Sequence, residues 1–226
     1  MLKVLKKSYS FIKKIVNLFG FNIIVRRNKV NSDTSFEKQV RLNQQNIKDL
    51  KIVLNRDILL SFLPKNGIIV ELGVDKGDFS DKIISLTHPK KLYLIDIWGS
   101  ERYNINKMKI VNKRFQKEID TGRIILIRGT SDNELKKFED GYFDWVYIDT
   151  THSYKQTIKE LELCRIKVKD GGIIAGHDYC QGNINKALKY GVVQAVNQFC
   201  VKYDWEFIFL THETDRKLSF AIRKIQ

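Results

Sequence analysis

Cysteine is scarce in this sequence of 226 residues, which contains only three. Cys164, Cys180 and Cys200 are odd in number and far apart, and no Cys-x-x-Cys pair is present. This pattern argues against a disulfide framework and against a zinc knuckle. Lone cysteines of this kind are usually small buried side chains, so we expect a reducing, cytoplasmic location.

Long apolar runs are also lacking. In the first 30 residues the longest stretch without a charge is 15–25, which is shorter than the roughly 18 residues that span a bilayer. No small-residue cleavage site accompanies it, so a secretory signal is not expected. The hydrophobic content of 43% is enough for one α/β core with an N-terminal appendage.

Acidic residues are missing from the first 30 positions, which hold eight lysines and arginines within a net charge of +14. Leu5, Tyr9, Ile12, Val16 and Phe19 recur at helical spacing with lysines opposite, which predicts a basic amphipathic helix in residues 1–30. This helix packs on protein, either its own domain or a second subunit of a homo-oligomer, or it lies on an anionic membrane surface. Nucleic acid is the least favoured partner, because basic and aromatic residues do not interleave along the body of the chain.

The rest of the chain divides into a helical lead-in, residues 31–66, and a domain, residues 67–226. A helix is expected from about Phe36 to Leu63, ending at a turn that contains Pro64 and Gly67. Strands and helices then alternate. Strands are expected at 68–71, 92–96, 124–128, 145–149, 172–176, 205–211 and 217–224, the first five parallel and the last two a hairpin.

The most informative motif is an apolar strand that ends at Glu71 and passes into a turn with Gly73 and Gly77. A second strand ends at Asp96, 25 residues after Glu71, where a carboxylate can bind the two hydroxyls of a ribose. The Gly-x-Gly-x-x-Gly fingerprint of dinucleotide sites is absent. Glu71 would repel phosphate but favour a cationic amino-acid group, so the motif predicts a nucleoside that carries such a group.

At these residues, and over roughly Ile68 to Lys224, the sequence resembles the class I S-adenosylmethionine (SAM)-dependent methyltransferases. The resemblance implies an α/β fold: a Rossmann-like, mostly parallel sheet of seven strands with a C-terminal antiparallel hairpin, preceded by N-terminal helices. It implies that the cofactor SAM contacts Glu71, Gly73, Gly77 and Asp96. It also implies that Ser131 or Asp132 meets the adenine edge, although these residues also fit a helix N-terminus. Trp98, which follows the second strand, is expected either to cover the adenine or to be a core residue.

A second motif joins Asp149 and His152, after the fourth expected strand, to His177 and Asp178, after the fifth. It looks like a subgroup of O-methyltransferases that modify small molecules and sugars, including enzymes of macrolide, aminocoumarin and bacterial polysaccharide pathways. The resemblance implies that His152 is a general base, or else that it orients the following helix. It also implies a magnesium site at Asp149, His177 and Asp178; without a metal, Asp149 acts electrostatically near the sulfonium.

The sequence therefore predicts a SAM-dependent O-methyltransferase acting on a hydroxyl of a sugar, a glycan precursor or a related small molecule. The expected location is cytoplasmic, at the membrane surface if residues 1–30 bind lipid. Two alternatives stay open. One is a methyltransferase acting on RNA, although no Asn-Pro-Pro-Tyr-like amine-methylating motif is present. The other is a non-catalytic nucleoside-binding scaffold on the same fold.

Overall fold

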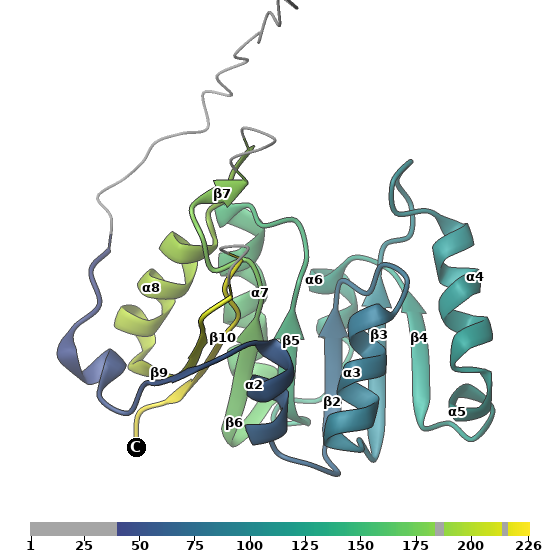
Figure 1. Ribbon diagram of the computed structural model, residues 1–226, viewed down its shortest axis with the longest axis horizontal. Helices are drawn as coiled ribbons and strands as arrows, with labels where there is room; N and C mark the ends of the chain where they lie inside the picture. Colours follow the sequence, from purple (N-terminus) through teal and green to yellow (C-terminus); the bar gives the residue numbers. More distant parts are fainter. Residues whose placement is uncertain (1–39, 184–187, 214–216) are drawn as a thin grey trace, which may run out of the picture. The chain divides into compact units, whose positions relative to one another are not determined.

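A mixed sheet of eight strands forms the centre of the part of the chain that the computed structural model describes, residues 40–183, 188–213 and 217–226 (Figure 1). The strand order is β1-β9-β10-β6-β5-β2-β3-β4. The strands are β1 (Lys51–Val53), β2 (Ile68–Leu72), β3 (Lys91–Asp96), β4 (Ile124–Arg128), β5 (Phe143–Ile148), β6 (Val168–Gly176), β9 (Trp205–Thr211) and β10 (Phe220–Lys224). Of these strands only β10 is antiparallel to its neighbours.

Helices cover both faces of this sheet, as Figure 1 shows. They are α2 (Arg56–Phe62), α3 (Asp78–Thr87), α4 (Ile105–Arg114), α5 (Gln116–Asp120), α6 (Ser131–Leu135), α7 (Tyr154–Lys167) and α8 (Val192–Tyr203). One core cluster lies under α2, α3 and α4 and includes Leu59 and Ile83. The other lies under α6, α7 and α8 and includes Leu161 and Phe199. The sheet is buried on both sides, which explains why its central strands read as continuous apolar runs.

The seven strands expected from the sequence all form, and they confirm a Rossmann-like parallel sheet with an antiparallel hairpin at its C-terminal end. The expectation of only seven is wrong, because β1 adds an eighth strand that pairs in parallel with β9. A second, two-stranded sheet contains β7 (Gly182–Asn183) and β8 (Leu188–Lys189).

The single helix expected from about Phe36 to Leu63 is wrong over its described part. That segment contains a short 3-10 helix, η1 (Gln44–Ile47), then β1, then α2. Asn46 explains why it belongs to the core: its buried Nδ2 donates to the carbonyls of Cys200, 3.3 Å, and Trp205, 2.8 Å. The amphipathic helix expected in residues 1–30 lies outside the described residues.

The parallel strands fix where a site can form. Strands β2, β3, β4, β5 and β6 all run in the same direction, so their carboxyl ends meet along one edge of the sheet. In open α/β sheets, ligands bind outside this edge, where the strand order reverses. Here that point lies between β2 and β5, on either side of which the chain runs outward in opposite directions.

Candidate functional site

The turn after β2 is held in shape by Gly73 and Asp96. Gly73 has φ +88°, and a Cβ at this position would lie 2.0 Å from the carbonyl oxygen of Asp149. The Asp96 carboxylate accepts backbone N–H bonds from Val74, 2.8 Å, and Asp75, 3.0 Å. These bonds tie the turn after β2 to the end of β3. Only glycine fits at position 73, because the backbone there passes so close to that of Asp149. Gly77, with φ +79°, precedes α3 as its N-cap.

A cavity of about 480 Å³ opens over this turn and extends to the ends of β3, β4 and β5. Its lining includes seven of the residues singled out from the sequence: Glu71, Gly73, Asp96, Ser131, Asp132, Asp149 and His152. The first motif and the Asp149–His152 part of the second therefore converge on one cavity large enough for a nucleoside cofactor, whereas His177 and Asp178 do not line it. Gly77 borders the turn rather than lining the cavity, and packs against the Phe115 side chain, which lies 2.9 Å from the position of a Cβ.

Glu71 ends β2 with its side chain 1% exposed. Ser80 Oγ donates a hydrogen bond of 2.5 Å to Glu71 Oε2. Burial raises the pKa of Glu71 to about 8, and the Ser80 bond opposes that rise only in part. The residue is therefore a buried carboxyl group that a cationic ligand would convert into a stable carboxylate.

Trp98 does not line the cavity. It is 1% exposed, lies in the core cluster under α3 and α4, and donates from Nε1 to the carbonyl of Asp75, 3.0 Å. Of its two expected roles, the structure therefore shows the core role and not the adenine contact. Ser131 and Asp132 begin α6 and line the cavity; Ser131 donates to Glu160, and Asp132 pairs with Lys159.

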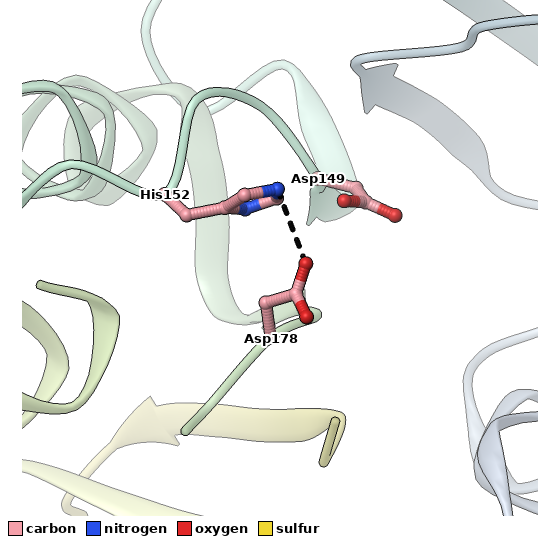
Figure 2. Close-up of side chains that lie close together, drawn as sticks. All are labelled: Asp149, His152 and Asp178. Carbon is pink, nitrogen blue, oxygen red and sulfur yellow. Dashed lines mark ion pairs between the residues drawn. The ribbon is translucent and has the colours of Figure 1, made fainter. Parts of the chain in front are cut away.

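Three titratable side chains meet at the carboxyl ends of β5 and β6 (Figure 2). His152 Nε2 lies 3.1 Å from Asp178 Oδ2, and Asp149 lies beside them, with candidate ligand atoms of all three within 4.8 Å of one another. His152 and Asp178 have φ of +59° and +56°, in the left-handed region. Such strained positions cluster at functional sites, which supports a role for this group.

The electrostatics of these side chains follow from their burial. Burial lowers the pKa of His152, and the Asp178 carboxylate only partly opposes that effect, so the imidazole is neutral near pH 7. Burial, together with repulsion from Asp178, raises the pKa of Asp149 to about 7. Asp178 Oδ1 is buried and accepts no hydrogen bond from the described residues. A cation is the kind of partner that this oxygen lacks.

His177 lies apart from this group. Its Nδ1 is 2.9 Å from Ser219 Oγ, beside β10. The geometry thus puts His152, rather than His177, next to the two carboxylates that were expected to hold a metal. Two carboxylates and an imidazole with one unpartnered oxygen fit a divalent cation in donor type.

Arg56 was not expected from the sequence. Its guanidinium carbon lies 4.5 Å from the centre of the Phe79 ring, and the residue lines the cavity. Burial alone would lower the pKa of Arg56, but Tyr147 and Asp149 raise it above its ordinary value. No motif marks this residue, because it reaches the site from α2, a helix whose place depends on distant contacts.

The fold is shared with solved methyltransferases, and part of the chain matches a methyltransferase family model. Residues 70–179, just under half of the chain, match a family model described as a methyltransferase domain. The matched segment runs from the strand before Gly73 to the loop that carries Asp178, so it contains both sequence motifs. A search of curated proteins finds no match.

Solved structures share this fold at low sequence identity. A candidate methyltransferase from Streptococcus mutans, solved in complex with S-adenosylhomocysteine (SAH), is 16% identical, with a TM-score of 0.55 over 75% of this chain and 96% of that one. An rRNA methylase from Streptococcus thermophilus is 14% identical, with a TM-score of 0.55 over 75% and 94%. The Bacillus subtilis tRNA methyltransferase TrmK is 10% identical, with a TM-score of 0.55 over 77% and 67%. These similarities support the fold and leave the acceptor open.

Proposed function

We propose that the chain is a SAM-dependent O-methyltransferase that acts on a hydroxyl of a sugar, a glycan precursor or a related small molecule. The observation that carries this proposal is a single cavity joining the glycine turn and Asp96 to His152. One ligand can therefore place its ribose at Asp96 and its reacting group beside His152. The match to a methyltransferase domain and the SAH complex of a protein with the same fold support the choice of cofactor.

The cofactor is held by complementary charge and by close backbone approach. Gly73 lies beneath the amino-acid part of SAM, Gly77 supports this turn from outside the cavity, and Glu71 receives the ammonium group of SAM. Asp96 accepts from the ribose through Oδ1, because Oδ2 already accepts from the backbone N–H groups of Val74 and Asp75 while Oδ1 accepts only from that of Trp98. Ser131 and Asp132 lie at the adenine end.

In the transfer itself, the acceptor oxygen attacks the methyl carbon as the carbon–sulfur bond breaks, and SAH leaves as a neutral thioether. The acceptor proton passes to a ring nitrogen of neutral His152. Asp178, 3.1 Å from Nε2, stabilises the imidazolium that forms. The remaining contribution of the protein is alignment of the oxygen, carbon and sulfur atoms, with water excluded.

Asp149, His152 and Asp178 are the residues that would hold a magnesium ion, which would lower the pKa of the acceptor hydroxyl. His152 would then act as a ligand and not as the base. Transfer without a metal leaves His152 free to take the proton.

The test is SAH release from SAM with a panel of nucleotide sugars as acceptors. His152→Ala should lower turnover by about 100-fold or more, the usual scale for loss of general-base assistance, with SAH affinity nearly unchanged. The exposed His212 provides the matched control, His212→Ala, which should keep full turnover. Chelation followed by addition of magnesium separates the two forms of the mechanism. Full turnover in His152→Ala would contradict the proposal.

A second candidate function is methylation of RNA. It is favoured by the net charge of +14 and by structural neighbours whose names specify rRNA and tRNA. The same assay with rRNA and tRNA transcripts distinguishes the two candidates. Methyl transfer to RNA but to no sugar would replace the first proposal with this one.

A further inference from the structure

A buried polar network forms the wall of the cavity between α6 and α7. Its centre is Glu160, whose side chain is fully buried. Ser131 Oγ donates to Glu160 Oε1, and Thr150 Oγ1 donates to Glu160 Oε2 at 2.8 Å. Gln156, on the turn of α7 before Glu160, completes the network. No other part of the mechanism uses these contacts.

The network fixes the orientation of the Gln156 side-chain amide. Gln156 Nε2 lies 3.0 Å from Glu160 Oε1 and 3.1 Å from Ser131 Oγ. The Glu160 carboxylate can only accept, and the Ser131 hydroxyl hydrogen is already donated to it, so both neighbours accept from Gln156. Both amide hydrogens are thereby used. Among the described residues no donor contacts Gln156 Oε1, and the Gln156 side chain lines the cavity.

With the ribose of a nucleoside at Asp96, Gln156 lies beside the place where the purine base would be. The cavity extends from Asp96 along Gly129 to Asp132 and reaches Gln156 on the facing helix. Asp132 is an alternative acceptor, but its Oδ2 is paired with Lys159. Gln156 therefore presents a carbonyl oxygen, held by a buried network, at the purine end of the cavity.

We propose that Gln156 is the residue that selects adenine, by accepting a hydrogen bond from the 6-amino group through Oε1, and that Glu160 is the positioning residue that holds its amide in this orientation. This inference rests on the proposed binding of SAM. An acceptor at this point favours a 6-aminopurine. A 6-oxopurine such as hypoxanthine would bring two acceptor oxygens together without a proton between them, and is rejected.

The test is calorimetric titration of the full chain with SAH and with S-inosylhomocysteine, which differ at the 6-position of the purine. The wild type should bind SAH at least about tenfold more tightly. Gln156→Leu should weaken SAH binding and bring the ratio of the two dissociation constants close to one. The control Gln116→Leu, the same substitution at an exposed position on α5, should keep the wild-type ratio.

Glu160→Gln tests the positioning role, because glutamine at 160 can donate as well as accept and so permits residue 156 to turn over. Glu160→Gln should lower the ratio of the S-inosylhomocysteine dissociation constant to the SAH dissociation constant by a larger factor than it weakens SAH binding. If this buried variant does not fold, Gln156→Leu still decides. Equal binding of both nucleosides by the wild type, or an unchanged ratio in Gln156→Leu, would overturn the inference while leaving SAM binding intact. Failure of the wild type to bind SAH would instead overturn the proposed function.

Discussion

Glu71 is a carboxyl group in a place that disfavours its own charge. It is buried at the end of β2, and its pKa of about 8 lies well above the ordinary 4.5. A group of this kind destabilises the unliganded protein when it ionises, yet it is suited to a cationic ligand. We infer that cofactor binding offsets this destabilisation, because an ammonium group would stabilise the ionised form of Glu71.

This position predicts a pH-dependent stability difference between the wild type and Glu71→Gln. Below about pH 4.5 the carboxyl is protonated in both the folded and the unfolded chain, so it has no effect. As the pH rises toward about 8, the unfolded chain ionises while the folded chain resists. The free energy of unfolding of the wild type then falls by at most about 1.4 kcal/mol per pH unit. Urea unfolding should show that Glu71→Gln becomes more stable relative to the wild type between pH 5 and pH 8. The control Glu139→Gln, at an exposed position, should show no such relative increase in stability. A constant difference between wild type and Glu71→Gln would contradict this account.

Gly73 provides a second prediction at the residue scale. Gly73→Ala would combine a positive φ with a Cβ only 2.0 Å from a backbone oxygen, so it should lower the free energy of unfolding by more than about 2 kcal/mol. Gly122→Ala is the matched control, because Gly122 has φ +69° but no atom within 4 Å of the new Cβ. It should cost only about 1 kcal/mol. Equal losses in the two variants would show that the close approach to Asp149 does not matter.

At the scale of elements, the helices and strands differ in how far the sequence could predict them. The strand from Trp205 to Thr211 was predicted at both ends, because an apolar run between turns is a local signal. Strand β1 was missed, because its three residues form a strand only through pairing with β9, more than 150 residues later. Local periodicity contains no information about such a partner, and the charged stretch around β1 resembles a helix.

The same limit applies to the site. Asp149 and Asp178 could be predicted because each follows a strand that the sequence marks clearly. Which of His152 and His177 lies beside these two carboxylates could not be predicted, since it depends on the left-handed backbone at His152 and Asp178. Gln156 and Glu160 were also missed, because their roles come from hydrogen bonds between α6, α7 and the loop after β5.

The anchoring of η1 by Asn46 leads to a prediction about stability. Asn46→Ala removes the side-chain donor from two carbonyls, those of Cys200 and Trp205. It should lower the free energy of unfolding by about 1–3 kcal/mol, the cost of leaving buried acceptors unpaired. Asn112→Ala, at an exposed position in α4, should change it by less than about 0.5 kcal/mol. No difference between the two variants in thermal or urea unfolding would mean that η1 is not anchored as the structure shows.

At the scale of the whole molecule, charge is uneven: eight basic residues and no acidic one occupy the first 30 positions. In the described part of the chain, no helix has the length and hydropathy needed to cross a membrane. We propose that residues 1–30 attach the chain to the surface of an anionic membrane. Each basic residue near such a surface contributes about 1 kcal/mol.

Replacing Lys3, Lys6, Lys7, Lys13 and Lys14 together by Gln tests this proposal in the full chain. Sedimentation with vesicles containing phosphatidylserine should show strong binding of the wild type and at least a tenfold loss in the variant. Vesicles of phosphatidylcholine alone should bind neither. Replacing five exposed lysines elsewhere, at positions 51, 65, 90, 109 and 113, should have a smaller effect. Equal sedimentation of wild type and N-terminal variant would contradict the membrane role.

The central claim is that the cavity over Gly73 and Asp96 binds SAM. Calorimetric titration of the full chain with SAH and with NAD tests it most directly, because both carry an adenosine but only SAH has an amino-acid group for Glu71. We predict that SAH binds, that NAD binds much more weakly, and that Asp96→Ala weakens SAH binding by about 1–3 kcal/mol. Tighter binding of NAD than of SAH would contradict the account.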